Sequence, residues 1–138
     1  MAQCRVESKM ELTASVEAVW GLVGDFGNLS WIPGIADVAM TVEGEGVGAL
    51  RSLELEGELV VERLESYQDG KSYSYSISGG PLPMTNYLAV IQVDATPQGS
   101  VMSWFSDFDV KQGPTDEAEK FVTELYAAGL AAVKSELG

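Results

Sequence analysis

The chain has 138 residues, 46% hydrophobic and 21% charged, which suits a soluble globular protein of one domain, residues 1–138, with a substantial core or an internal cavity. Its net charge of −13 would repel phosphate backbones and anionic lipids, so we expect no binding to nucleic acid or to a membrane. A single cysteine, Cys4, and the lack of histidine exclude an internal disulfide, a Cys/His zinc site and the commonest general base, and we expect no metal or cofactor.

The beginning of the chain, MAQCR, lacks the apolar core of a signal peptide, and no stretch of the sequence is long and apolar enough to span a bilayer. We therefore expect the protein to reside in the reducing cytoplasm. The sequence predicts no particular oligomeric state.

The first part of the chain predicts a strand followed by helical segments. Polar and apolar residues alternate over 4–12, which indicates a strand with one buried and one solvated face. Thr13 or Ser15 can cap the helix that follows, because its apolar positions have helical spacing. Residues 28–31 are compatible with a second short helical turn, and residues 35–42 with a strand.

Two tight-turn signals, Glu56-Gly57 and Asp69-Gly70, interrupt the strand-like residues 49–77. If both are two-residue hairpin loops, the pairing of the strands follows by counting outward from each loop. The first loop then places Arg51 directly opposite Glu62.

The second loop places Glu62 opposite Ile77 and Leu64 opposite Tyr75, so Arg51 and Glu62 share a face of the sheet with apolar side chains. A charged pair is costly to bury on such a face. Two interpretations follow. The pair is either a polar anchor that orients a ligand's oxygen or relays a proton, or a self-satisfied pair that fixes the register of the sheet.

Two more strands, over 85–93 and 101–110, precede a long helix that begins near Pro114. The residues expected on the inner faces of these strands are Tyr87, Ala89, Ile91, Val93, Met102, Trp104, Ser106 and Phe108. The helix carries one apolar stripe, formed by Ala118, Phe121, Val122, Leu125, Gly129, Ala132 and Val133. The loop at 79–84, with two glycines and two prolines, is either a lid or an ordinary connection.

Short turns between consecutive strands predict an antiparallel meander, and the long helix must bury its stripe against the concave face of that sheet. The predicted fold is therefore α+β, with a curved sheet of about seven strands wrapped on a long C-terminal helix and two short helices after the first strand.

The order of these elements and several local motifs resemble the START-related, birch-pollen-allergen-like helix-grip superfamily (SRPBCC), in its polyketide cyclase/dehydrase branch. The motifs are Val19-Trp20, Asp25-Phe26-Gly27-Asn28-Leu29, Trp31-Ile32-Pro33-Gly34, Glu62-Arg63-Leu64, Tyr75-Ser76-Ile77, Asn86-Tyr87 and Ala128-Gly129-Leu130. The resemblance covers nearly the whole chain and implies a helix-grip fold with an internal cavity. It does not imply one activity, because the superfamily includes lipid carriers, hormone receptors and cyclases.

The plant abscisic-acid receptors are similar relatives, and the chain departs from them at several points. The receptor's gate loop corresponds here to the short turn at 55–58, and the His-Arg-Leu of its latch corresponds to Leu82-Pro83-Met84. The receptor's carboxylate-binding lysine has no counterpart, and a pocket asparagine corresponds to Gly129. Glu62 and Tyr87 do match polar pocket positions. The resemblance therefore implies a similar cavity without hormone sensing of that kind.

The expected ligand-binding residues are Arg51, Glu62, Tyr75, Ile77, Tyr87, Trp104, Phe108, Phe121, Leu125 and Gly129. The first predicted function is binding of a small hydrophobic molecule (lipid, polyketide or isoprenoid-like) in a cavity between the sheet and the C-terminal helix. The alternative is a cofactor-free cyclase, dehydratase or isomerase with Glu62 and Tyr87 as acid/base groups. A third interpretation is a protein–protein module of the same fold with no obligate ligand.

Overall fold

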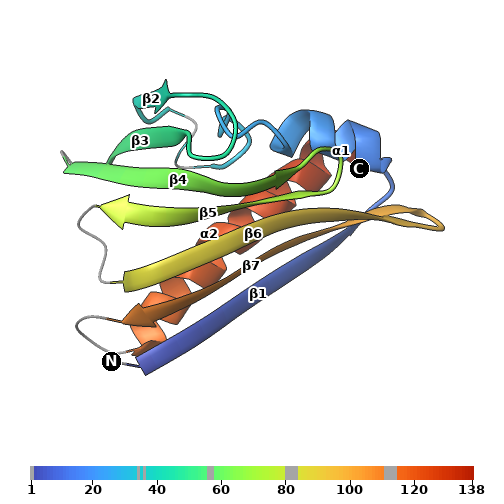
Figure 1. Cartoon of the computed structure of the whole chain (residues 1–138). Helices are drawn as coiled ribbons and strands as arrows, with labels where there is room; N and C mark the ends of the chain where they lie inside the picture. The colour runs from blue at the N-terminus through green and yellow to red at the C-terminus, as the bar shows by residue number, and fades with distance from the viewer. Residues whose placement is uncertain (1, 34, 36, 56–57, 80–83, 111–114) are drawn as a thin grey trace.

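The structure, a computed structural model, describes residues 2–33, 35, 37–55, 58–79, 84–110 and 115–138. Its elements in chain order are β1 (Ala2–Leu12), α1 (Val16–Val23), β2 (Met40–Glu43), β3 (Leu50–Leu55), β4 (Glu58–Gln68), β5 (Ser72–Gly79), β6 (Met84–Thr96), β7 (Gly99–Val110) and α2 (Thr115–Leu137). All neighbouring strands are antiparallel, in the order β1-β7-β6-β5-β4-β3-β2. The sheet curves around one side of α2 (Figure 1), which confirms the predicted helix-grip α+β fold.

The segment between β1 and β2 contains one short helix, α1. Of the two candidate caps, Ser15 is used, because its Oγ accepts a hydrogen bond from the backbone N–H of Ala18 at 3.2 Å. The second short helix expected at 28–31 is not present among the described residues. The chain there forms turns instead, for example with the N–H of Ile32 bonded to the carbonyl of Leu29.

These turns also shorten the strand predicted at 35–42, since β2 begins only at Met40. The turns at 29–32 have a physical reason: three side chains are buried there that do not lie on one face of a helix or of a strand. Leu29, Trp31 and Ile32 are each at most 5% exposed, and two of them are adjacent in sequence. A turn can direct consecutive side chains inward, whereas a strand would place them on opposite faces.

The predicted pairing of the central hairpins is confirmed. Arg51 lies opposite Glu62 in the β3–β4 pair. Glu62 lies opposite Ile77, and Leu64 opposite Tyr75, in the β4–β5 pair. Alternation along each strand therefore brings the charged pair onto the inner face of the sheet.

The second hairpin loop is longer than predicted, although the resulting register is the same. Gln68 pairs with Ser72, which leaves a three-residue loop in which Gly70 has a positive φ of 74°. A register shift between Leu64 and Ser66, where a β-bulge accommodates one extra residue, offsets the longer loop. The pairs from Leu64 to Glu62 return to the predicted positions, and a second register shift follows, since Val61 pairs with Gly79.

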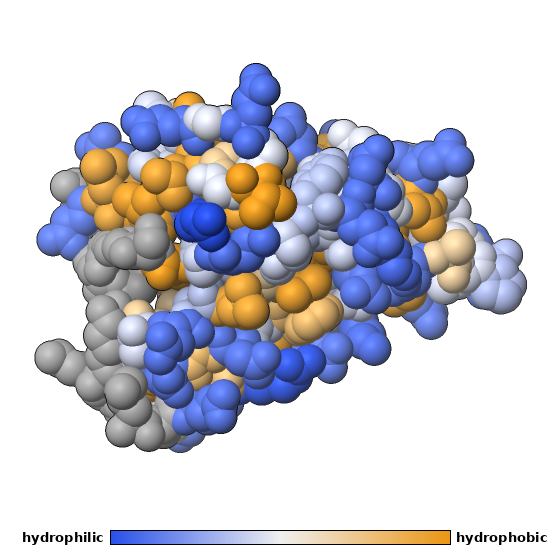
Figure 2. All heavy atoms as spheres, in the orientation of Figure 1, coloured by the Kyte–Doolittle hydropathy of each residue, from blue (hydrophilic) through white to orange (hydrophobic). Residues whose placement is uncertain are grey.

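The inner faces predicted for the last two strands are buried in the structure. The helical stripe is only partly as predicted: Val122 and Val133 are buried, but Phe121 is 50% exposed and Tyr126, which the predicted stripe omitted, is fully buried. The face of the molecule seen in Figure 2 carries hydrophilic side chains with separate apolar areas between them. No helix within the described part of the chain combines the length and apolar character needed to cross a membrane.

Candidate functional site

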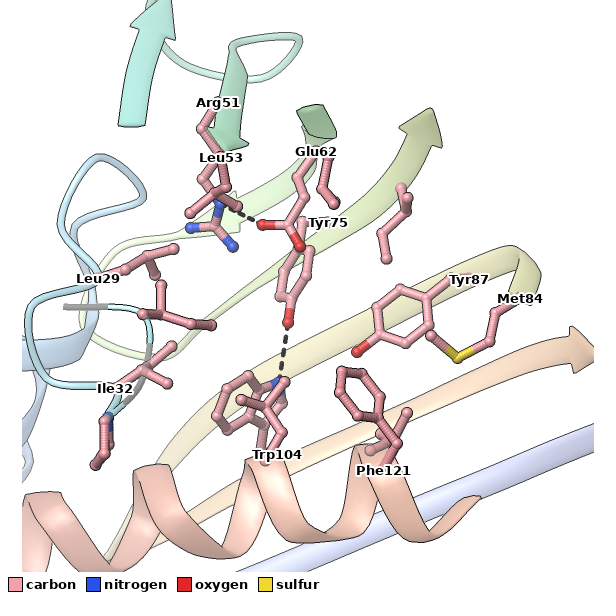
Figure 3. A pocket seen from close by; sticks show the side chains of 16 residues that line it. Leu29, Ile32, Arg51, Leu53, Glu62, Tyr75, Met84, Tyr87, Trp104 and Phe121 are labelled. Atoms are coloured by element: carbon pink, nitrogen blue, oxygen red, sulfur yellow. Dashed lines mark hydrogen bonds and ion pairs between the residues drawn. The ribbon is translucent and has the colours of Figure 1, made fainter. Parts of the chain in front are cut away.

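A cavity of about 350 Å³ lies between the inner face of the sheet and α2, and the turns after α1 close one side of it (Figure 3). Its lining side chains are Leu29, Ile32, Pro33, Ile35, Arg51, Leu53, Val60, Glu62, Tyr75, Ile77, Met84, Tyr87, Trp104, Phe121, Val122 and Leu125. The wall is predominantly apolar, with a few polar groups that come from four different strands. Such a composition is typical of sites for small organic molecules.

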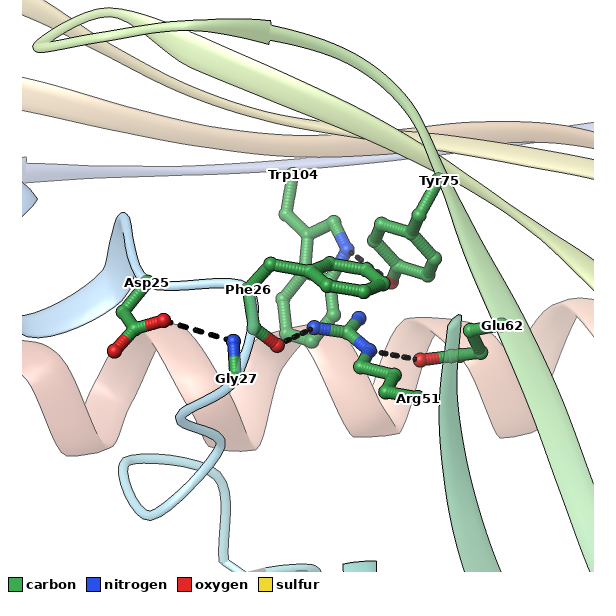
Figure 4. A network of polar contacts seen from close by, with 7 residues as sticks. All are labelled: Asp25, Phe26, Gly27, Arg51, Glu62, Tyr75 and Trp104. Carbon is green, nitrogen blue, oxygen red and sulfur yellow. Dashed lines mark hydrogen bonds and ion pairs between the residues drawn. The ribbon is translucent and has the colours of Figure 1, made fainter. Parts of the chain in front are cut away.

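Arg51 is a buried cation that holds three parts of the fold together. Its side chain is 2% exposed, and its Nε donates to Oε1 of Glu62 at 2.6 Å. Its Nη1 donates to the backbone carbonyl of Phe26 at 2.8 Å, which ties the turn after α1 to the sheet (Figure 4). The guanidinium carbon also lies 4.2 Å from the ring centroid of Phe26 and 4.7 Å from that of Tyr75.

These contacts keep Arg51 charged. Burial by itself lowers the pKa of a guanidinium, but the adjacent carboxylate of Glu62 outweighs that effect, and the pKa of Arg51 lies above its ordinary value. Arg51 is therefore a permanent cation that is satisfied largely by the protein itself.

Glu62 has a different role in the pair. Its side chain is 12% exposed and lines the cavity, whereas Oε1 is occupied by Arg51. No group of the described residues donates to the second oxygen, Oε2. Figure 3 shows this oxygen directed away from Arg51 and toward the interior of the cavity. The cavity thus contains a hydrogen-bond acceptor that carries negative charge and has capacity for a donor.

The hydroxyl groups of three tyrosines lie around the cavity as neutral groups. Trp104 donates its Nε1–H to the Tyr75 hydroxyl at 3.1 Å, and the hydroxyls of Tyr87 and Tyr126 are hydrogen-bonded to each other. Burial raises the pKa of Tyr75 and of Tyr87 well above the ordinary value, and raises that of Tyr126 as well. These groups therefore remain protonated at neutral pH and act as hydrogen-bond donors or acceptors, not as bases.

Eight of the ten predicted ligand-binding residues line this one cavity. Phe108 and Gly129 do not. Phe108 lies behind Tyr87, with 5.8 Å between ring centroids. Gly129 lies under the indole rings of Trp31 and Trp104.

Sequence reasoning missed the wall formed by the turns after α1, including Leu29 and Ile32. It also missed Tyr126, which stacks on Trp104 with 4.1 Å between centroids. A signal for Tyr126 was present in the sequence, since it lies four residues after Val122 and four before Leu130, and all three are buried. Residues 80–83 of the loop predicted at 79–84, and residues 56–57 of the turn predicted at 55–58, lie outside the described residues. Among those described, no His, Cys, Asp and Glu side chains are grouped as a metal site would require.

Gly129 allows α2 to approach the aromatic wall, which leads to a prediction about stability. A Cβ at this position would lie 2.8 Å from Cζ3 of Trp104 and 3.1 Å from Cζ3 of Trp31. We expect Gly129→Ala to lower the free energy of unfolding by about 1–3 kcal/mol, measured by urea denaturation, because overpacking outweighs the gain in helix propensity.

Gly21 is the matched control, because it is also helical but has no atom within 4 Å of the corresponding Cβ position. Gly21→Ala should raise the free energy of unfolding by about 0.5–1 kcal/mol. Equal stabilisation by both substitutions would contradict the close packing at Gly129.

A curved antiparallel sheet that wraps one side of a long C-terminal helix, with an apolar cavity between the two, defines a helix-grip protein. The chain belongs to the family described as polyketide cyclase / dehydrase and lipid transport, which matches residues 3–138. This membership and the fold support hydrophobic-ligand binding in general.

Solved structures of similar proteins agree with this assignment. The protein XoxI from Bacillus cereus is 32% identical, with 99% of this chain and 96% of that chain covered and a TM-score of 0.83. An uncharacterised protein from Bacillus thuringiensis is 35% identical, with coverage of 96% and 98% and a TM-score of 0.84. Ara h 8.0201, at 18% identity, coverage of 98% and 97% and a TM-score of 0.77, shares the fold. No curated protein sequence matches the chain.

Proposed function

We propose that the protein binds a small, mostly apolar molecule that carries a hydroxyl or another hydrogen-bond donor, of lipid, polyketide or isoprenoid-like character. The observation that carries this proposal is the free carboxylate oxygen of Glu62 in an otherwise apolar cavity. A hydroxyl group that reaches Oε2 makes a hydrogen bond to a charged acceptor, which is worth more than one between neutral groups.

The charges of the site disfavour an anionic ligand. Arg51 is already paired with Glu62 and bonded to the carbonyl of Phe26, so it offers little uncompensated positive charge. A carboxylate or phosphate head near Oε2 would meet a like charge in a mostly apolar cavity, where charges are screened less than in bulk water. The net charge of −13 adds a long-range repulsion of the same sign.

The volume supports a ligand of modest size. About 350 Å³ is near the lower end of the range for small-molecule pockets, and equals the liquid volume of roughly a dozen water molecules. Phe121 lines the cavity and is 50% exposed, so its position on α2 is suited to the entrance.

A matched series of decanol, decanoate and decane tests the proposed ligand chemistry, with tryptophan fluorescence as the readout because Trp104 lines the cavity. Decanol should bind about tenfold or more tightly than decanoate. Glu62→Gln should weaken decanol binding about tenfold and strengthen decanoate binding, because it removes the charge and keeps an acceptor for Arg51.

Glu54→Gln is the control for this experiment, since Glu54 is an exposed residue of the neighbouring β3. It should leave all three affinities unchanged. Equal affinity of the wild-type protein for decanol and decanoate, or an unchanged preference in Glu62→Gln, would reject the assignment of Oε2 as the anchor.

The second candidate function is cofactor-free acid/base catalysis, and the joint presence of Glu62 and Tyr87 in one cavity supports it. Glu62 would accept a proton from the carbon next to a carbonyl group, and the protonated Tyr87 would donate a hydrogen bond to the carbonyl oxygen. Deuterium exchange into a medium-chain methyl ketone, followed by NMR in heavy water, tests this. Exchange that is faster than the buffer rate and is lost in Glu62→Gln and in Tyr87→Phe would favour the enzyme, and exchange at the buffer rate would favour a binding protein.

A further inference from the structure

The first strand, β1, is a long edge of the sheet. It has 11 residues and, among the described strands, pairs with β7 alone. In Figure 1 it forms one margin of the sheet, with no drawn element beyond it. An edge of this length presents backbone N–H and C=O groups that can pair with another strand.

The outer face of β1 carries four exposed charges at alternate positions: Arg5, Glu7, Lys9 and Glu11. Their signs also alternate, so the strand is locally neutral while the whole chain has a charge of −13. Figure 2 shows hydrophilic side chains along the margin where β1 runs. Two copies can therefore approach each other at this edge without the repulsion that the rest of the surface would produce.

We propose that the protein forms a homodimer in which β1 pairs with β1 of a second copy, antiparallel and centred on Ser8. In this register Arg5 lies opposite the partner's Glu11, and Glu7 lies opposite the partner's Lys9. Two-fold symmetry repeats both pairs, so every charge of the outer face meets an opposite charge.

The same charges exclude the nearest alternatives. A pairing centred on Glu7 would place Glu7 opposite itself and Arg5 opposite the partner's Lys9. A pairing centred on Lys9 would place Lys9 opposite itself and Glu7 opposite the partner's Glu11. Both arrangements bring like charges together, and a shift by a single residue would exchange the two faces of the strand.

Within one copy these charged side chains make only weak or half-exposed contacts, so they remain available for ion pairs with the partner. Arg5 bonds to Asp107 at 3.0 Å through Nη1, and this pair is about half exposed. Glu7 and Lys9 are 4.0 Å apart on the same strand, which is a weak contact. Lys134 donates to the backbone carbonyl of Glu11 at 3.4 Å and leaves the Glu11 carboxylate without a partner among the described residues.

Analytical ultracentrifugation of the full chain and of charge-reversed variants tests the proposal. The wild-type protein should sediment as a dimer that dissociates on dilution. Glu7→Lys and Lys9→Glu should each weaken the dimer about tenfold or more, since two symmetry-related pairs become repulsive. The double variant, and an equimolar mixture of the two single variants, should restore the dimer because both recreate opposite charges at every position.

Glu45→Lys is the matched control, because it changes the net charge as Glu7→Lys does but lies in an exposed loop away from β1. It should leave dimerisation intact. A wild-type protein that is monomeric at all accessible concentrations, or a dimer that Glu7→Lys does not weaken, would overturn the proposal.

The position of the two-fold axis has its own test. Residues directly opposite each other in antiparallel strands have Cα atoms roughly 4.5–5.5 Å apart, within reach of a disulfide. In a Cys4→Ser background, Ser8→Cys should form an intermolecular disulfide under mild oxidation, and Gln3→Cys should not. The reverse result would overturn the register centred on Ser8.

Discussion

Arg51→Met is expected to lower the free energy of unfolding by about 3–5 kcal/mol, measured by urea denaturation. The substitution keeps much of the side-chain volume but leaves the carboxylate of Glu62, 12% exposed, without its counter-ion. It also removes the donor to the carbonyl of Phe26, which holds the turn after α1 on the sheet. An unpaired charge and an unsatisfied carbonyl in a buried position explain the size of the effect.

A double substitution distinguishes the stability cost of removing the whole ion pair from the cost of leaving one of its charges unpaired. Arg51→Met combined with Glu62→Leu should recover most of the stability, because a buried ion pair replaced by apolar groups costs little. The control is Arg5→Met, whose partner Asp107 is 50% exposed and whose removal should cost about 0–1 kcal/mol. Arg51→Met that is no more destabilising than Arg5→Met would contradict the structural role given to Arg51.

The protein is also expected to lose stability steeply above about pH 10, the ordinary pKa of tyrosine. Burial raises the pKa values of Tyr73, Tyr75, Tyr87 and Tyr126 in the folded state. The unfolded chain therefore releases these protons at a lower pH than the folded protein does. The stabilising difference is fully present below about pH 10 and is lost as the pH rises toward the folded-state values.

One pH unit above 10 corresponds to about 1.4 kcal/mol for each tyrosine that stays protonated in the folded state, so the four together should cost about 6 kcal/mol by that point. Urea denaturation at a series of alkaline pH values gives the slope, and tyrosinate absorbance should rise together with unfolding. Tyr126→Phe should reduce the slope by about one proton. Tyrosinate formation by all four residues while the fold remains intact would contradict their burial.

The Arg51→Met experiment and the binding series assign different roles to the two members of the Arg51–Glu62 pair. Arg51 is predicted to matter chiefly for stability, because its contacts are to the protein itself. Glu62→Gln is predicted to matter chiefly for ligand preference, because it keeps an acceptor for Arg51 and changes only the charge that faces the cavity. The sequence alone is compatible with either role for the pair as a whole.

Much of the site could be predicted because β-strand alternation is strictly regular. Once the turns were located, counting placed Arg51, Glu62, Tyr75 and Ile77 on one face, and the structure has the same pairs. The count was correct for the second hairpin only because a β-bulge offset a longer loop. No feature of the sequence indicated this compensation.

Counting along strands could not predict the structure of the turns after α1. Burial of Leu29, Trp31 and Ile32 follows no regular period. The sequence therefore could not predict that the second helix is absent, nor that the turns after α1 form part of the cavity wall. The apolar face of α2 was misplaced for a related reason. Its stripe is broad, and only contact with Trp104 decides that Tyr126 faces inward while Phe121 lies at the surface.

The order of the strands, the register of the central hairpins and the presence of a charged pair on an apolar face can be read from the sequence, because they depend on local periodicity and turn chemistry. Which oxygen of that pair is free, which aromatic rings cover the pair and how much space remains become known only once the chain is folded. These properties depend on packing between segments far apart in the chain, such as the turn at Phe26 against β3 and α2 against Trp104. Close packing of this kind is set by the shapes of many side chains together, and no single segment encodes it.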